Sequence, residues 1–153
     1  MPKIAVLLFA LGVVVSAVEL PAKKYLNLAA IKTMVKAAEE EAARRNVQVT
    51  LCIVDENGTV IFMQKGDGVG INTLRFAERK ARHAALYRSP SKSAADAVKN
   101  GNLATLVMPE AFPNQGGVPI KLDGQTIGGI AASGAASEVD EAIAQAGVDA
   151  ILK

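Results

Sequence analysis

Apolar residues near the beginning of the chain follow a helical spacing. Between Leu28 and Ala42 they recur at steps of three and four, which places them on one face of a helix. Asn27 precedes this run and can cap the first turn, because its side-chain oxygen can accept a hydrogen bond from a free backbone N–H. Asn46 follows two arginines and ends the pattern. We therefore expect a helix over residues 27–45.

Runs of β-branched residues with short turns between them predict two hairpins. The run Val47–Val54 predicts a strand, and Thr59–Lys65 predicts the strand that returns. Asn57-Gly58 lies between them and supplies the positive φ angles of a tight hairpin turn. Residues 117–133 repeat this pattern, with Asp123-Gly124 at the turn. We expect both pairs of strands to be antiparallel.

The remaining segments predict further helices and one more strand. Residues 72–87 form a helical pattern, a short helix follows over 91–100, and a last helix runs over 137–152. Leu103–Met108 is mainly apolar and predicts a third strand in this part of the chain. The helix over 72–87 has a face of small residues on which a neighbouring backbone could pack: Ala77, Ala81, Ala84 and Ala85. The order of elements, with no linker between them, predicts one α+β domain.

The first 17 residues differ from the rest of the chain. Met1-Pro2-Lys3 is a short basic start, Ile4–Val15 is an uncharged run of 12 residues, and Val15-Ser16-Ala17 is small or apolar. This is the layout of a secretory signal peptide. As a helix the run covers about 18 Å, too short for the roughly 30 Å core of a bilayer. We expect a signal peptide at residues 1–17, a mature domain at 18–153 and a secreted or periplasmic protein. An apolar strand or core helix is the structural alternative.

Composition and charge exclude several classes of protein. The chain has 153 residues, the length of one domain, and its apolar content of 50% excludes intrinsic disorder. The net charge of +2 comes from basic residues scattered among acidic ones, so we expect no nucleic-acid partner. Cys52 is the single cysteine, so no intramolecular disulfide can form, and its apolar surroundings predict a buried thiol. With one histidine and one cysteine, no clustered metal site is expected.

Two segments carry the side chains best suited to a ligand. His83 is the single histidine and lies one helical turn from Arg79 and Lys80. We interpret it either as a partly exposed helix residue or as a ligand contact. The second segment is the loop before a predicted strand, with Asn114, Gln115, Gly116 and Gly117. The glycines let the backbone approach another group closely, or they form a structural turn. We expect the ligand site where the helix and this loop meet.

These same segments resemble a known family. Arg79-Lys80-Ala81-Arg82-His83-Ala84-Ala85, Gly116-Gly117-Val118-Pro119-Ile120 and the glycine-rich segment 127–134 occur in this order. The combination resembles the GlcG/HbpS-like family of haem-binding or haem-degrading-domain proteins. The same domain forms the C-terminal half of some corrinoid adenosyltransferases. The resemblance covers nearly the whole mature chain.

The resemblance implies a profilin-like fold, with a central antiparallel sheet flanked by helices, and assembly into homo-oligomers. It also implies that haem or another small molecule binds near the helix that contains Lys80 and the loop that contains Gly116 and Gly117. This chain departs from the family at His83, where many members carry a small residue or threonine. That departure makes His83 a candidate iron ligand or general base.

Two functions of different classes remain open. The first is an exported binding protein for haem or a related planar cofactor, with His83 as an iron ligand and Met108 or Met63 as a softer one. The second is a small-molecule enzyme, such as an isomerase, lyase or hydratase.

In the enzyme, His83 would transfer a proton and Lys80 or Arg79 would hold an anionic group. The amides of Gly116 and Gly117 would stabilise negative charge. A haem-binding protein needs His83 beside an open, haem-sized slot, whereas the enzyme needs it in a small closed pocket with a cation beside it.

Overall fold

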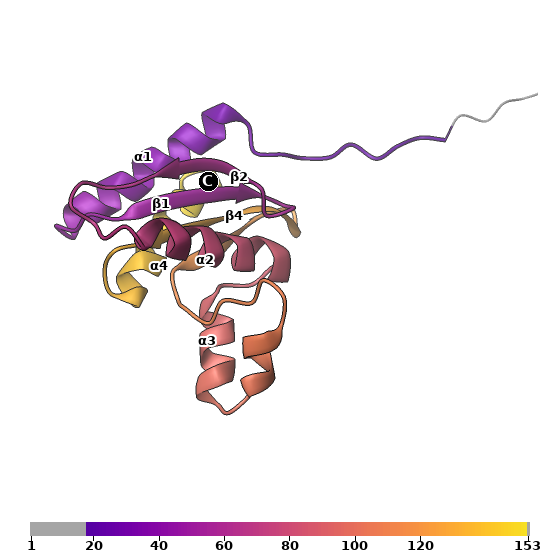
Figure 1. Cartoon of the computed structure of the whole chain (residues 1–153). Coiled ribbons are helices and arrows are strands. Elements are labelled where there is room, and N and C mark those ends of the chain that lie inside the picture. Colours follow the sequence, from indigo (N-terminus) through magenta and orange to yellow (C-terminus); the bar gives the residue numbers. More distant parts are fainter. Residues whose placement is uncertain (1–17, 153) are drawn as a thin grey trace, which may run out of the picture.

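The computed structural model describes residues 18–152, and the predicted signal peptide lies outside the described residues. Within them, four strands form one antiparallel sheet in the order β2-β1-β4-β3, with helices packed on it (Figure 1). The elements in chain order are α1 (Leu28–Arg44), β1 (Thr50–Asp55), β2 (Val60–Gln64), α2 (Thr73–Tyr87), α3 (Lys92–Lys99), the 3-10 helix η1 (Leu103–Val107), β3 (Gly117–Leu122), β4 (Gln125–Ser133) and α4 (Ser137–Asp149). The predicted α+β fold with a central antiparallel sheet is confirmed.

Both predicted hairpins are present, and their inner strands pair with each other. β1 pairs with β2 across the Asn57-Gly58 turn, and β3 pairs with β4 across the Asp123-Gly124 turn. β1 also pairs with β4, with Cys52 opposite Ala131, so these two strands form the middle of the sheet. Both middle strands are almost wholly buried, because helices cover both of their faces.

The two faces of the sheet carry different helices. On one face, α1 and α4 pack together and enclose the larger core, in which Met34 and Ile143 meet sheet residues such as Ile53. On the other face, α2 packs on a smaller cluster around Cys52 and Ala131. Side chains alternate between the faces of a strand, so neighbours such as Cys52 and Ile53 lie in different cores. Among residues 18–152, no helix is both long enough and apolar enough to cross a membrane.

Helix α2 lies unusually close to the sheet, because glycines face its backbone. A Cβ atom on Gly117 would lie 2.2 Å from the carbonyl oxygen of Lys80, and one on Gly129 would lie 2.3 Å from that of Ala81. The small-residue face of α2, which includes Ala77 and Ala84, is buried in this contact. The neighbouring backbone on which this face packs is therefore that of the sheet in the same chain, and the homo-oligomer stays a prediction.

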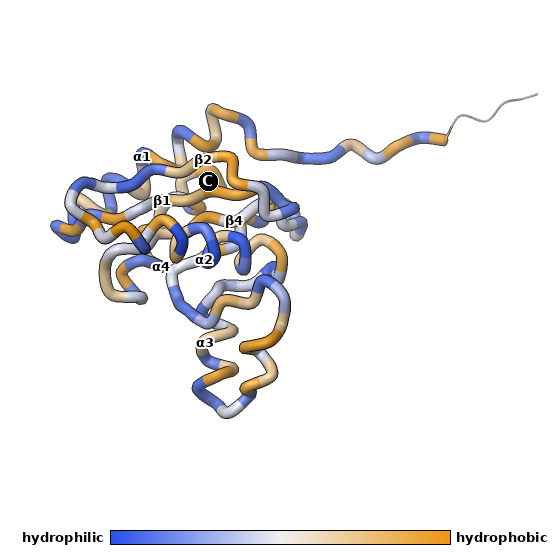
Figure 2. The backbone as a smooth tube through the Cα atoms, in the orientation of Figure 1, coloured by the Kyte–Doolittle hydropathy of each residue, from blue (hydrophilic) through white to orange (hydrophobic). Residues whose placement is uncertain are grey.

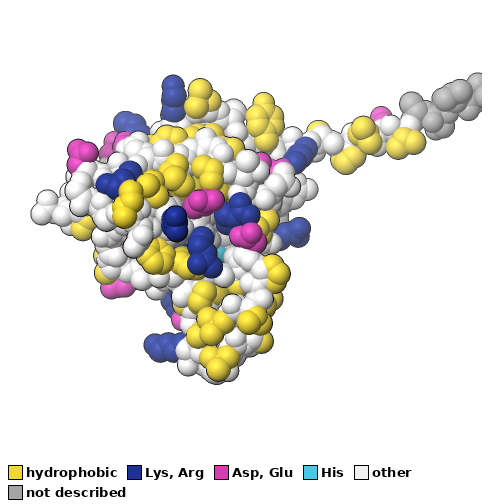
Figure 3. Space-filling model, in the orientation of Figure 1, with side chains coloured by type: hydrophobic (Ala, Val, Ile, Leu, Met, Phe, Trp, Pro, Cys, Tyr) yellow, Lys and Arg dark blue, Asp and Glu magenta, His cyan; other side chains and the backbone are white. Residues whose placement is uncertain are grey.

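The segment after α3 is not the predicted third strand. It forms η1 instead, which packs on α3, and the two project from the body as an arm at the bottom of Figure 1. Leu103, Leu106 and Val107 are 63%, 55% and 84% exposed. Figure 2 colours much of this arm as hydrophobic, and Figure 3 shows hydrophobic side chains on its surface. An apolar run becomes a strand only where a neighbouring strand can take its hydrogen bonds. Here the backbone bonds locally, as from Met108 N–H to the Thr105 carbonyl.

Candidate functional site

The functional side chains lie on the outer face of α2. The inner face of α2 packs on the sheet, so polar and aromatic side chains can lie on the opposite face of the helix. Residues on this stripe recur at steps of three and four: Asn72, Arg75, Phe76, Arg79, His83 and Tyr87. Figure 3 shows basic side chains beside apolar ones over this helix. Two cavities lie along the stripe, one at each end of it.

The first cavity is a cleft of about 400 Å³ lined by Asn72, Arg75, Phe76 and Arg79. The Phe76 ring is 40% exposed and stacks on the Phe112 ring, with 5.6 Å between centroids and 28° between planes. The Arg79 guanidinium lies 4.2 Å from the centroid of the Phe112 ring. Aromatic faces suit a flat apolar ligand, and arginines suit carboxylates. This cleft therefore fits a planar, anionic molecule.

The second cavity has about 170 Å³ and lies between α2, α3 and η1. It is lined by His83, Tyr87, Ser89, Ser93, Ala94, Ala97, Thr105, Met108 and Ala111. Its volume is well below the roughly 300–1,000 Å³ of pockets that hold drug-sized ligands. No lysine or arginine is among these lining residues.

His83 is 3% exposed, so the interpretation of it as a partly exposed residue is wrong. Its Nδ1 accepts a hydrogen bond from the Phe112 backbone N–H at 3.1 Å, and its ring stacks on Tyr87 with 4.7 Å between centroids. Burial lowers the pKa of the imidazole, which favours the neutral form. Because Nδ1 accepts, the proton of the neutral ring lies on Nε2. Among the described residues, Nε2 has no hydrogen-bond partner.

This arrangement does not fit His83 as an iron ligand. A neutral imidazole binds a metal through a nitrogen lone pair. In this ring the lone pair belongs to Nδ1, where the Phe112 N–H occupies it, and Nε2 carries the proton. The adjoining cavity is also too small for a porphyrin. Of the two methionines considered, Met108 lines this cavity, whereas Met63 packs on the Cys52 cluster.

Lys80 holds the fold together and does not line either cavity. Its side chain is 2% exposed, and its amine donates to Asp140 Oδ2 at 2.8 Å and to the Ala132 carbonyl at 3.2 Å. The other oxygen of Asp140 accepts the Ala135 N–H at 3.0 Å. This buried network joins α2 to the end of β4 and to the first turn of α4. The sequence pattern gave no sign that Lys80 and Asp140 pair, because they lie 60 positions apart.

The loop predicted to bind a ligand instead bonds to the protein itself. The Gly117 N–H donates to Ser91 Oγ at 2.9 Å, and that hydroxyl donates to the Asn114 carbonyl at 2.7 Å. The Gly116 carbonyl accepts the Ala132 N–H at 3.2 Å. Gln115 is half-buried, and neither it nor Asn114 lines either cavity on α2.

The groups of the predicted enzyme therefore do not meet at one cavity. His83 lines the small cavity, and Arg79 lines the cleft. The amine of Lys80 and the amide of Gly117 have partners inside the protein. Sequence reasoning found His83 and Arg79 but missed Phe112, which links the two cavities through its ring and its N–H. The helical spacing from Asn72 to Tyr87 was the available signal for the stripe itself.

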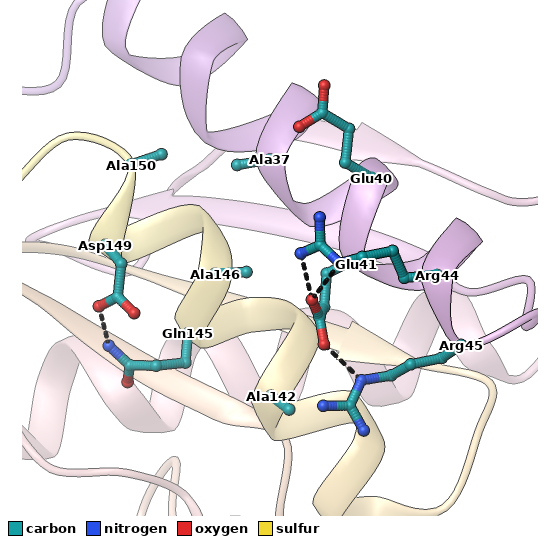
Figure 4. A pocket seen from close by; sticks show the side chains of 10 residues that line it. All are labelled: Ala37, Glu40, Glu41, Arg44, Arg45, Ala142, Gln145, Ala146, Asp149 and Ala150. Carbon is teal, nitrogen blue, oxygen red and sulfur yellow. Dashed lines mark hydrogen bonds and ion pairs between the residues drawn. The ribbon is translucent and has the colours of Figure 1, made fainter.

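The groove between α1 and α4 and the thiol of Cys52 are weaker candidates for a functional site. A groove of about 570 Å³ lies between α1 and α4 (Figure 4), but Arg44 and Arg45 at its edge both bind Glu41. The other polar side chains of its lining are paired as well, Glu40 with Lys36 and Gln145 with Asp149, and the remaining lining residues are alanines. Cys52 is fully buried, and burial raises the pKa of its thiol to about 12. Among residues 18–152, no group of three or more His, Cys, Asp or Glu could hold a metal ion.

Comparison with known proteins places the chain among similar sequences and structures. The model of the family described as "Haem degrading protein HbpS-like" matches residues 26–149. Protein GlcG of Escherichia coli K12 is 31% identical over 111 residues, which are 72% of this chain and 83% of GlcG. The crystal structure of HbpS has a TM-score of 0.80 at 30% identity and covers 91% of this chain and 100% of its own. That of the PduOC–haem complex has a TM-score of 0.77 at 27% identity and covers 84% and 96%.

Proposed function

Because the chain belongs to the HbpS-like family, as the resemblance predicted, we propose that it is a binding protein for haem or a related planar cofactor. Two findings support haem as the ligand: the family is described as haem-degrading, and the similar protein PduOC was solved as a haem complex. The observation that carries the proposal is the cleft on α2, where Phe76 stacks on Phe112 and two arginines stand beside the rings.

The cleft supplies the two kinds of contact that haem requires. The exposed Phe76 ring offers apolar surface to the flat porphyrin. Arg75 and Arg79 each present a planar fork of N–H donors, which matches the two oxygens of a carboxylate. Bound haem would supply a redox-active iron. The protein would hold the macrocycle and its carboxylates, without iron ligation by His83.

Titration with haemin, followed by absorbance, tests this function. Arg75→Ala and Arg79→Ala should each weaken binding about tenfold, because each removes a charged hydrogen bond to a carboxylate. Arg44→Ala is the matched control, since it removes the same charge from α1, where Arg44 already pairs with Glu41. If both cleft variants bind haemin as tightly as the parent, the cleft is not the haem site. If the parent does not bind haemin, haem is not the ligand of this protein.

We also propose that the protein is exported and forms homo-oligomers. The basic start and apolar run of residues 1–17 support export, with a mature protein that begins at Val18. The exposed apolar side chains of η1 support a contact between copies, because burial of exposed apolar surface is favourable.

The intact mass of the exported product tests whether residues 1–17 are removed. Light scattering of Leu106→Lys beside the parent tests whether η1 forms the contact between copies. A product that begins at Met1, or a parent with the mass of one chain, would refute the corresponding proposal.

A further inference from the structure

One buried hydrogen bond connects the imidazole of His83 to the haem cleft. The Phe112 N–H donates to His83 Nδ1 at 3.1 Å, and both residues are buried. The Phe112 ring contacts two side chains that line the cleft, because it stacks on the Phe76 ring and lies under the Arg79 guanidinium. His83 itself does not line the cleft. It therefore acts on a ligand there through Phe112.

Phe112 belongs to a loop, residues 108–116, without regular secondary structure. Two other side chains of α2 also bond to this loop: Tyr87 to the Pro109 carbonyl, and Arg82 to the Glu110 carboxylate. The bond to His83 is the one that acts on the backbone of Phe112 itself. Of the contacts between α2 and this loop, it therefore has the most direct effect on where the Phe112 ring lies.

Protonation of the imidazole removes this hydrogen bond. The neutral ring carries its proton on Nε2, so Nδ1 is the atom that takes up a second proton. The lone pair of Nδ1 already accepts the Phe112 N–H, and it cannot do both. In the protonated ring, an N–H group at Nδ1 would face the N–H group of Phe112. The backbone of Phe112 must therefore move away before His83 can hold a second proton.

The elements packed around His83 do not stabilise a positive charge on its ring. From α3, η1 and the loop, the cavity beside the ring is lined by uncharged side chains: Ser93, Ala94, Ala97, Thr105, Met108 and Ala111. The sheet meets α2 with uncharged residues, among them Cys52, Ala131 and Gly117. Tyr87 stacks on the ring, but its hydroxyl donates to the Pro109 carbonyl.

The charged groups of α2 near His83 are engaged elsewhere: Arg82 with Glu110 of the loop, Lys80 with Asp140 of α4, and Arg79 with the Phe112 ring. Burial therefore lowers the pKa of the imidazole. The neutral form, and with it the bond to Phe112, is present above the ordinary imidazole pKa of about 6.5 and is lost as the pH falls through the lowered value.

We propose that His83 is a positioning residue of the haem cleft, and that haemin binds tightly only while neutral Nδ1 holds Phe112 in place. When His83 is protonated, Phe112 moves, the Phe76 ring and the Arg79 guanidinium lose their support, and the cleft releases haemin. The inference rests on the proposed haem function. It makes haemin binding depend on pH through a histidine that does not touch the ligand.

Two substitutions separate the acceptor from the charge. His83→Asn keeps an acceptor at the same place, because Oδ1 of asparagine and Nδ1 of histidine are both bonded to Cγ, but the amide does not titrate. His83→Leu is also uncharged and has no acceptor. At pH 8, His83→Leu should bind haemin about tenfold more weakly than the parent, because the Phe112 N–H loses its partner. His83→Asn should bind haemin as the parent does.

The pH profile is the measurement that a merely structural role would not change. Haemin affinity is measured from pH 8 to pH 5 for the parent and for His83→Asn, which share every other titrating group, including the carboxylates of haemin. Below the pKa of His83, the parent should lose affinity relative to His83→Asn by about tenfold per pH unit, because binding must then release one proton.

NMR of the ¹⁵N-labelled, haem-free parent measures that pKa independently, because His83 is the single histidine of the chain. Above the pKa we expect the Nε2–H tautomer and a scalar coupling between the ¹⁵N nuclei of Phe112 and His83 Nδ1, and below it the coupling should disappear. These measurements and the profile of the parent decide the question even if His83→Leu does not fold.

Several results would overturn the inference: an Nδ1–H tautomer, an imidazole that is still neutral at pH 5, equal pH profiles in the parent and His83→Asn, or equal affinities at pH 8 in His83→Asn and His83→Leu. If the parent binds haemin and one of these results is found, the inference fails and the haem function stands. If the parent does not bind haemin at pH 8, the proposed function itself fails, and the inference fails with it.

Discussion

Replacement of Lys80 by methionine is expected to lower the stability of the fold strongly and to leave the haemin affinity of the folded protein unchanged. The substitution leaves Asp140 without its cationic partner in a site where both side chains are 2% exposed. Removal of one member of a buried ion pair costs about 3–5 kcal/mol. With a urea dependence of about 2 kcal/mol per molar, the unfolding midpoint should fall by roughly 1.5–2.5 M.

The double variant Lys80→Met/Asp140→Leu separates the charge from the packing. Because the double variant has neither charge, it should recover most of the free energy of unfolding that Lys80→Met loses. Apolar pairs of similar volume often replace buried ion pairs at little cost. A residual deficit of about 1 kcal/mol is expected, since Asp140 also accepts the Ala135 N–H. Urea unfolding followed by circular dichroism measures Lys80→Met, Asp140→Leu and the double variant, and haemin titration is carried out on the folded double variant.

The result that would refute this reasoning is specific. If Lys80→Met keeps the stability of the parent but loses haemin affinity, Lys80 contacts the ligand and the buried pair does not support the fold. If the double variant is as unstable as the sum of both single variants, the two charges do not act as a pair.

Three further predictions follow from buried groups. Gly117→Val should prevent folding, as judged by circular dichroism, because its Cβ would lie 2.2 Å from the backbone carbonyl of Lys80; a folded variant would contradict the close contact. Cys52 should resist maleimide in buffer and react in urea, because it is buried with a thiol pKa raised to about 12; rapid labelling of the native protein would contradict this. The pKa of His83 is lowered in the folded state, so its contribution to stability is full above about pH 6.5 and is lost as the pH falls through the lowered value. Urea unfolding should therefore show that the free energy of unfolding falls less between pH 7.5 and pH 5 in His83→Gln than in the parent. An equal fall in both proteins would contradict this prediction.

Local rules in the sequence were sufficient for most of the secondary structure. The cap at Asn27 and the spacing after it gave α1, with Asn27 accepting the Ala30 N–H at 2.8 Å. Asn57-Gly58 and Asp123-Gly124 marked both hairpin turns, although at the first of them only Gly58 has the expected positive φ (79°), whereas Asp123 and Gly124 both have it (50° and 78°). Family motifs then indicated the fold, which the HbpS structure shares.

Properties that depend on distant neighbours came only from the tertiary structure. An apolar run such as Leu103–Met108 is a strand only if a sheet edge is present beside it, and none is. Lys80 acts as a ligand group or as a structural one depending on Asp140, which lies 60 positions away. His83 acts as a metal ligand or as a donor depending on which nitrogen accepts the Phe112 N–H. Burial and hydrogen bonding change the chemistry of a side chain, and both are set by the residues that the fold brings next to it.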